Sequence, residues 1–191
     1  MQISNLTSNK GIFFKGIKIL CPRIFEDNRG YFYESWNQSV LEENIYKINF
    51  CQENHSYSKE NVLRGLHFQL NPYSQGKLVE CLSGVIFDVI VDLRIGSPTF
   101  LQWGGVKLSG NNHKQIWIAK GFAHGFYTLS KEAHVIYKID NYWKKEYERT
   151  IIWNDSNLSI NWPLIHEIPE ISDKDSYGKK ISEISKEDLF L

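Results

Sequence analysis

The sequence predicts an all-β protein, an antiparallel sandwich or barrel with a few short helices, and three observations carry this prediction. Apolar and polar residues alternate over many short runs, glycine and proline bound the clearest of them, and no long helical pattern separates one run from the next. A βαβ fold would need such helices. Aromatic residues make up 14% of the chain, which suits a β protein with rings lining its interior or a cavity.

The clearest strand covers residues 85–93. Its odd-numbered residues are all apolar and face one way, whereas Asp88 and Asp92 face the other. Gly84 precedes this run and Gly96-Ser97-Pro98 ends it, as turn residues should. Similar runs predict further strands at residues 12–20, 31–36, 47–54, 63–69, 101–108, 115–118, 125–129 and 135–142.

Helices are expected to be short. One is predicted over residues 39–46, where Leu41 and Ile45 share a face and Asn37 or Ser39 could cap the first turn. The polar tail from Ser172 is expected to form short helical pieces or to be irregular. Because the 191 residues contain no internal repeat and no low-complexity linker, we expect one domain over residues 1–191, with a small helical appendage from about residue 172.

Charge and cysteine content argue against several classes of protein. The 22 basic residues balance the 22 acidic ones, which does not favour binding to nucleic acid or to a membrane surface. Cys21, Cys51 and Cys81 form an odd set without a Cys-x-x-Cys pair, so a reducing compartment is expected rather than disulfides or a zinc ribbon. The sequence shows neither a signal peptide nor a membrane-spanning run, so we expect a soluble cytoplasmic protein.

The strongest candidate for a site is the run Leu63-Arg64-Gly65-Leu66-His67-Phe68-Gln69, which Lys77 follows closely. On strand-like spacing this run aims Arg64 and His67 into a cavity that other segments complete. Such side chains suit a polar, anionic substrate, with a histidine available for proton transfer. His124 lies in an apolar stretch bracketed by glycines, where a packed histidine and a ligand contact are equally plausible.

Two further groups could assist His67. An aspartate within residues 170–175 either belongs to a solvated acidic turn or folds back on His67, where it would fix the imidazole tautomer and raise its basicity. Tyr137 lies on an alternating strand and is either structural or a phenol that points into the cavity and protonates a carbanion.

A metal centre is the main competing interpretation, because small β-barrels can hold a metal ion on clustered histidines. A cupin metal site would need a His-x-His pair, but Gln69 stands two residues beyond His67, and no other His-x-His or His-Glu-x-x-His occurs. The Gly-x-Gly-x-x-Gly run of a dinucleotide site is also missing. The sequence therefore predicts no metal and no cofactor, and a metal-dependent cupin enzyme such as an oxygenase is the alternative.

A set of motifs runs in order along almost the whole chain. The motifs are residues 25–36 (FEDNRGYFYESW), 52–56 (QENHS), 63–69 (LRGLHFQ), 75–79 (QGKLV), 88–94 (DVIVDLR), 97–99 (SPT), 121–126 (GFAHGF), 137–138 (YK), 153–155 (WND), 162–163 (WP) and 171–175 (ISDKD). Any one of them is a weak signal, but the ordered set resembles the dTDP-4-dehydrorhamnose 3,5-epimerase family and related nucleotide-sugar epimerases.

The resemblance implies a cupin-like jelly-roll barrel that needs no metal and forms a homodimer with exchanged N-terminal strands. It implies a dTDP- or GDP-linked 4-keto sugar as substrate, in deoxysugar, O-antigen or capsular polysaccharide synthesis. By motif position, the general base is His67, its pairing carboxylate Asp175, the acid on the opposite face Tyr137 and the enolate-stabilising group Lys77. Substrate-binding positions match Gln52, Asn54, Arg64 and His124 around the sugar and diphosphate, and Arg29 and Glu34 on the nucleotide side, from across the dimer.

These residue types suit the chemistry that the resemblance implies. A 4-keto group acidifies the hydrogens on C3 and C5, so a base can remove one and leave an enolate. Reprotonation from the other face then inverts the centre. Epimerisation at C3 alone or at C5 alone stays open, as does a non-catalytic module that only binds a nucleotide sugar.

The chain departs from the family pattern at two places. Residues 118–120 (IAK) lack the proline and the acidic residue that usually precede Gly121, and Glu80 stands where a basic residue is common. Both departures are expected to border the site and to bear on the identity of the nucleotide and the sugar. The alternatives are dTDP or GDP, and a hexose or a heptose, since relatives include GDP-4-keto-heptose epimerases.

Overall fold

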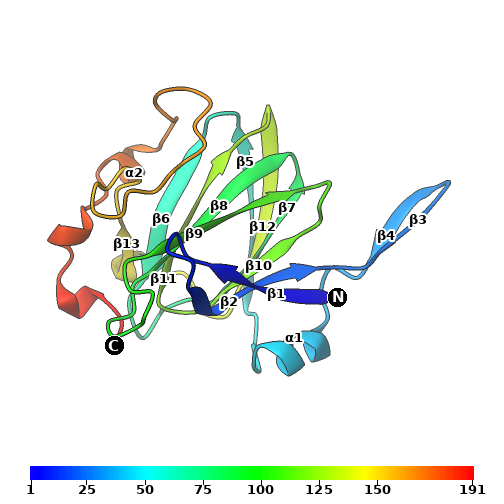
Figure 1. Cartoon of the computed structure of the whole chain (residues 1–191), viewed down its shortest axis with the longest axis horizontal. Coiled ribbons are helices and arrows are strands. Elements are labelled where there is room, and N and C mark those ends of the chain that lie inside the picture. The colour runs from blue at the N-terminus through cyan, green and yellow to red at the C-terminus, as the bar shows by residue number, and fades with distance from the viewer.

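The computed structural model describes all residues from 1 to 191, and β-strands dominate it (Figure 1). One antiparallel sheet has the strand order β1-β2-β10-β7-β12-β5, and a second has the order β13-β6-β11-β8-β9. The two sheets pack against each other as a cupin-like jelly-roll barrel, which confirms the predicted fold class. Strands β3 and β4 form a separate hairpin that projects from the barrel at the right of Figure 1.

The strands of the six-stranded sheet are β1 (Gln2–Thr7), β2 (Phe13–Cys21), β5 (Gln52–Lys59), β7 (Lys77–Ser83), β10 (Gln115–Ile118) and β12 (Glu132–Ile139). Those of the five-stranded sheet are β6 (Leu63–Gln69), β8 (Val85–Asp92), β9 (Trp103–Ser109), β11 (Phe122–Thr128) and β13 (Glu148–Thr150). The hairpin consists of β3 (Ile24–Asp27) and β4 (Gly30–Tyr33).

Most predicted strands are present with shifted ends, but the run at residues 47–54 is largely wrong. Strand β5 begins only at Gln52, and the apolar residue Ile48 instead packs beneath helix α1. Strands β1, β3, β7 and β13 were not predicted, for two physical reasons. Strand β7 is buried over most of its length and does not alternate, whereas β1, β3 and β13 are short or lie at edges.

The helices are few and short. Helix α1 (Gln38–Asn44) begins at the predicted cap, where the side chain of Asn37 accepts a hydrogen bond from the Val40 amide at 3.2 Å. The tail contains helix α2 (Asp173–Ser176) and the 3-10 helices Ile181–Glu183 and Lys186–Asp188, and a further 3-10 turn, Lys145–Tyr147, precedes β13. None of these helices is long and apolar enough to span a membrane.

The five-stranded sheet is buried on both faces. Its inner face packs on the six-stranded sheet through residues such as Ile86, Ile90 and Phe126. Its outer face is covered by the chain after β13, through Leu158, Trp162 and their neighbours. The face of β8 that carries Asp88 and Asp92 therefore points into the barrel, and both aspartates are fully buried.

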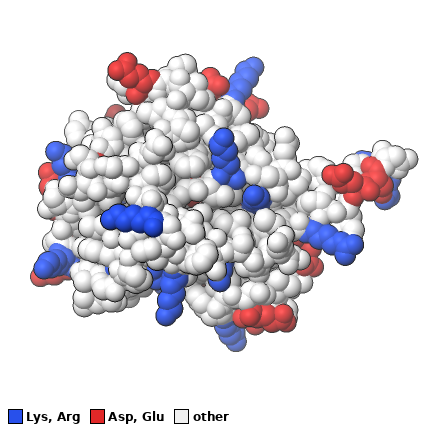
Figure 2. Space-filling view, viewed as in Figure 1, with Lys and Arg blue, Asp and Glu red and all other residues white.

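Side chains of both charge signs are scattered over the face of the molecule in Figure 2. At the tip of the projecting hairpin, acidic and basic side chains lie together. There Arg29 Nη2 and Asp27 Oδ2 form an exposed ion pair of 2.6 Å.

Candidate active site

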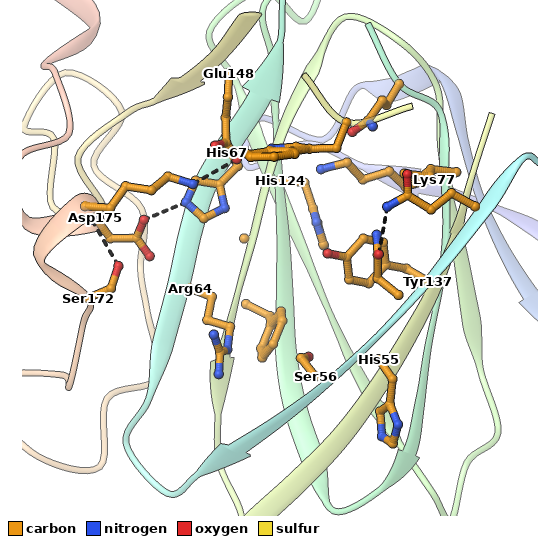
Figure 3. Close-up of a pocket in the computed structure, with 18 residues that line it drawn as sticks. His55, Ser56, Arg64, His67, Lys77, His124, Tyr137, Glu148, Ser172 and Asp175 are labelled. Carbon is orange, nitrogen blue, oxygen red and sulfur yellow. Dashed lines mark hydrogen bonds and ion pairs between the residues drawn. The ribbon is translucent and has the colours of Figure 1, made fainter. Parts of the chain in front are cut away.

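A cavity of about 580 Å³ opens between the two sheets, beside strands β5 and β6 (Figure 3). Eight of the ten predicted site residues line it. They are Gln52, Asn54, Arg64, His67, Lys77, His124, Tyr137 and Asp175. The apolar core fills the other end of the barrel, so the interior is divided into a packed half and a polar, open half.

His67 and Asp175 form a close pair on the wall made by β6. His67 Nε2 lies 2.6 Å from Asp175 Oδ1, and the Gly65 amide donates to Asp175 Oδ2 at 3.2 Å. Burial opposes ionisation of Asp175, but the hydrogen bonds from His67 and Gly65 and the positive charges nearby outweigh burial and hold its pKa below the usual value. An ionised Asp175 favours the tautomer with the ring proton on Nε2 and the lone pair on Nδ1. In Figure 3 the ring nitrogen that is not bonded to Asp175 faces the cavity.

A β-bulge places Arg64 and His67 on the same wall. Strict alternation would put residues three apart on opposite faces of a strand, so the predicted pattern alone does not explain their shared orientation. Opposite β11, His67 pairs with His124 and Arg64 with Phe126, so one extra residue is accommodated in β6. Gly65 sits in this bulge with a φ of 119°, a conformation that favours glycine.

Replacing Gly65 by alanine is expected to destabilise the fold by about 3 kcal/mol. A Cβ there would lie 2.6 Å from Gly125 Cα and 2.8 Å from the His124 carbonyl oxygen, and neither backbone can retreat easily. Gly96→Ala is the matched control, because its φ is also positive, at 84°, but a Cβ would meet nothing within 4 Å. Urea denaturation should show a clearly larger loss for Gly65→Ala, and equal losses would contradict the packing argument.

Tyr137 and Lys77 occupy the facing wall, on β12 and β7 of the other sheet (Figure 3). Burial raises the pKa of Tyr137, so its phenol keeps its proton at neutral pH. Burial lowers the pKa of Lys77 to about 8, although Glu148 and Asp88 attract its charge and oppose this shift. The cavity thus has a histidine–carboxylate pair on one wall and a protonated phenol with a poised ammonium group on the other.

His124 belongs to a second histidine–aspartate pair. Its Nε2 lies 2.8 Å from Asp88 Oδ2, and both side chains are almost completely buried. Asp88 Oδ1 is buried without a hydrogen-bond partner in the protein. The negative charge of Asp88 attracts the Lys77 ammonium group and works to raise its pKa. Of the two interpretations of His124, the structure therefore places it both in a packed pair and on the cavity wall.

Arg64, Gln52 and Asn54 form a polar rim. The Arg64 guanidinium donates to Ser58 Oγ and to the Tyr57 carbonyl oxygen, each at 2.9 Å, which leaves further N–H groups for a ligand. Gln52 Nε2 donates to Asn54 Oδ1 at 2.9 Å.

Eight further polar or aromatic residues of the cavity wall were not predicted as site residues. They are His55, Ser56, Gln75, Phe126, Trp143, Glu148, Ser172 and Lys174. Glu148 reaches the site because β13 pairs with β6, and its carboxylate forms a 2.8 Å ion pair with Lys174. Nothing in the charged stretch around Glu148 indicates that pairing, whereas Lys174 could have been found as the neighbour of Asp175.

Arg29 and Glu34 do not line the cavity of their own chain. Arg29 is at the tip of the projecting hairpin, and Glu34 directly follows β4. The two departures from the family pattern do not border the cavity either, which corrects that expectation. Glu80 is buried outside the cavity, and Lys120 pairs with Asp140 at 3.4 Å.

The side chains of the cavity do not gather into a metal-binding group. No three His, Cys, Asp or Glu residues lie together in a way that could hold a metal ion. His67 and His124 are each paired with a carboxylate instead.

A jelly-roll barrel that holds an imidazole across a cavity from a phenol and an ammonium group offers the groups that proton transfer at carbon requires, a chemistry typical of isomerases. Sequence comparison sharpens this class. The sequence profile described as dTDP-4-dehydrorhamnose 3,5-epimerase matches residues 12–183, so the chain belongs to the dTDP-4-dehydrorhamnose 3,5-epimerase family.

Individual relatives are similar over nearly their whole length. The chain is 52% identical over 165 residues to dTDP-4-dehydrorhamnose 3,5-epimerase of Shigella flexneri, which covers 86% of this chain and 90% of the relative. The epimerase of Legionella pneumophila in complex with dTDP-4-keto-L-rhamnose has a TM-score of 0.91 and 45% identity, covering 99% of this chain and 98% of the other. A 3′-monoepimerase from Streptomyces bikiniensis, in complex with dTDP-quinovose, has a TM-score of 0.82 and 28% identity over 88% and 85% of the chains.

Proposed function

We propose that this protein epimerises a dTDP-linked 4-keto-6-deoxyhexose at C3 and C5, by removing a proton from one face of the ring and returning one to the other. The observation that carries the proposal is the separation of His67 and Tyr137 on opposite sheets, with one cavity between them. Inversion of a carbon centre through an enolate needs a base and an acid on opposite faces of the sugar.

His67 is the base in this proposal. The lone pair on Nδ1 faces the cavity, while ionised Asp175 accepts from Nε2 and stabilises the imidazolium that forms on proton abstraction. Tyr137 is the acid, because its raised pKa keeps a proton available for the enolate. Lys77 is the ammonium group that stabilises the developing charge on the C4 oxygen.

The activity is expected to fall as pH rises through about 8. Below that value Lys77 is charged and stabilises the enolate, and above it the ammonium group is lost because burial has lowered its pKa to about 8. The alkaline limb of kcat/KM should therefore lie near pH 8 and should move to much higher pH in Lys77→Arg, whose guanidinium stays charged.

Lys120→Arg is the matched control for this profile, since Lys120 does not line the cavity. It should leave the limb near pH 8. A limb that stays near pH 8 in Lys77→Arg would contradict the assignment to Lys77.

The rim of the cavity suits a nucleoside diphosphate. Arg64 and Lys174 present cationic groups for the phosphates, and Gln52, Asn54 and His124 are placed to contact the sugar and diphosphate. Trp143, half exposed at the rim, offers an aromatic face on which a base can stack.

The hairpin supports a homodimer with exchanged N-terminal strands. An isolated two-stranded hairpin is marginally stable in water, yet β3–β4 exposes Phe25 and Phe32. A second copy would cover these side chains and receive Arg29 and Glu34 at the nucleotide side of its cavity. Mixing inactive His67→Ala with Arg29→Ala subunits should then restore activity, because a mixed dimer contains one site with both residues; no restoration would contradict the exchange.

Epimerisation at C3 alone is the second candidate, because the 3′-monoepimerase is also similar to this chain. Incubation with dTDP-4-keto-6-deoxyglucose in D2O, followed by NMR, separates the two. Deuterium at both C3 and C5 supports the double epimerase, and deuterium at C3 alone supports the monoepimerase. The absence of exchange with every dTDP-linked 4-keto sugar would reject both candidates. The same assay with GDP-linked 4-keto hexoses and heptoses tests which nucleotide and which sugar the protein accepts.

We infer a cytoplasmic location, in the synthesis of deoxysugars for O-antigen or capsular polysaccharide. The three cysteines are unpaired, as a reducing compartment would keep them.

A further inference from the structure

A buried carboxylate lies at the base of the projecting hairpin, outside the cavity. Glu80, on β7, is only 4% exposed and does not line the active site. Its Oε1 accepts a hydrogen bond of 2.7 Å from Tyr33 Oη, and its Oε2 accepts one of 2.7 Å from Gln115 Nε2. Burying a carboxylate is costly unless its oxygens are satisfied, so this group needs a structural or functional reason.

Tyr33 is the last residue of β4, so the carboxylate holds the hairpin where it leaves the barrel. Burial and the hydrogen bond to Glu80 raise the pKa of Tyr33 well above its usual value, so the phenol remains a donor. Gln115 Nε2 also donates to the Ser35 carbonyl oxygen at 2.6 Å, which fixes the chain just after the hairpin.

Aromatic packing adds to this attachment. The rings of Tyr31 and Tyr33 each lie with their centroids 4.7 Å from that of His113, a buried residue before β10. Neither β3 nor β4 pairs with a strand of the barrel. The hairpin is therefore oriented by side chains, and the hydrogen bond from Tyr33 to Glu80 is a charge-assisted one.

The residues that alternate with these tyrosines remain free. Phe32 is 71% exposed, and Glu34, which follows Tyr33, is exposed as well. Arg29 projects from the tip. The alternation thus divides the side chains of β4 into two sets. One set contacts the barrel of its own chain, and the other is available to contact a second copy.

We infer that Glu80 is a positioning residue: by holding Tyr33, it fixes the direction in which the hairpin leaves its own protomer and so places Arg29 and Glu34 against the nucleotide bound by the second copy. This inference rests on the proposed function and its dimer. It also gives a role to one of the departures from the family pattern. The Glu80 side chain is hydrogen-bonded to Tyr33 and Gln115 and does not line the cavity. In this inference Glu80 therefore affects substrate binding and not proton transfer.

Tyr33→Phe removes one hydroxyl and should loosen the hairpin without changing the cavity. We expect KM for the dTDP-4-keto sugar to rise about tenfold, while kcat stays within about twofold, because His67, Lys77 and Tyr137 are untouched. Tyr57→Phe is the matched control, since Tyr57 also donates to a carboxylate, Glu132, at 3.1 Å, but on the outer face of β5. It should leave KM unchanged.

A double-mutant cycle tests whether Glu80 and Tyr33 act through the same bond. Glu80→Gln should raise KM in the native background and should add little in the Tyr33→Phe background. Additive effects, or a fall in kcat at unchanged KM in Tyr33→Phe, would overturn the inference.

Mixed dimers test the action across the interface. A Tyr33→Phe subunit paired with a His67→Ala subunit has one working site, which receives the intact hairpin, and should show the native KM. A subunit carrying both substitutions, paired with a native one, supplies the loosened hairpin to the only working site and should show the raised KM. The reverse pattern would reject action on the second copy. A native protein that is monomeric or does not epimerise would instead reject the proposed function, and this is seen before any variant is made.

Discussion

His67→Asn is expected to lower the rate of deuterium exchange at C3 and C5 by about a thousandfold. Asparagine can occupy much of the space of the imidazole but cannot accept the proton. In the native protein, Nδ1 faces the cavity and Asp175, 3% exposed, stabilises the charge that the ring gains. The measurement is the exchange rate of a dTDP-4-keto sugar in D2O under saturating substrate.

The matched control is His166→Asn, because His166 is exposed and does not line the cavity. It should exchange at the native rate. Asp175→Asn should retain more activity than His67→Asn, since the imidazole keeps its lone pair and loses only its charged partner. An exchange rate within tenfold of native in His67→Asn would remove His67 from the role of base.

Tyr137→Phe is expected to separate exchange from inversion. His67 can still remove a proton and return a deuteron to the same face, so label should enter the substrate. The epimerised product should form about a hundredfold more slowly, because the phenol on the facing wall is gone. NMR measures both quantities in one sample, as label in recovered substrate and as product.

Tyr57→Phe again serves as the control, since Tyr57 points away from the cavity and should leave both rates unchanged. If Tyr137→Phe lost exchange and inversion equally, the phenol would be needed for proton abstraction as well. Native rates of product formation would show that another group supplies the proton.

The sequence predicts those parts of the fold that follow from local periodicity. The strand at residues 85–93 and the Asn37 cap depend on side chains within a few residues of each other, and both are present. Alternation alone does not say which face meets solvent. Asp88 and Asp92 look like a polar outer face, but they lie inside the barrel because the chain after β13 covers the other side.

The site is less predictable, because non-local contacts assemble it. The shared orientation of Arg64 and His67 depends on a bulge opposite β11, which no pattern within residues 63–69 reveals. Glu148 enters through the pairing of β13 with β6. The family resemblance predicts that Asp175 pairs with His67. The alternative interpretation of residues 170–175 as a solvated acidic turn holds for the exposed Asp173 but not for the buried Asp175.

The pair between His67 and Asp175 also has a consequence for the order in which the enzyme is made. The two residues are 108 positions apart, and the carboxylate arrives on a segment that must first dock on the outside of the barrel. Chains are synthesised from the N-terminus, and their early parts can begin to fold before the rest emerges from the ribosome. A nascent chain therefore displays the histidine long before the carboxylate that pairs with it has been synthesised.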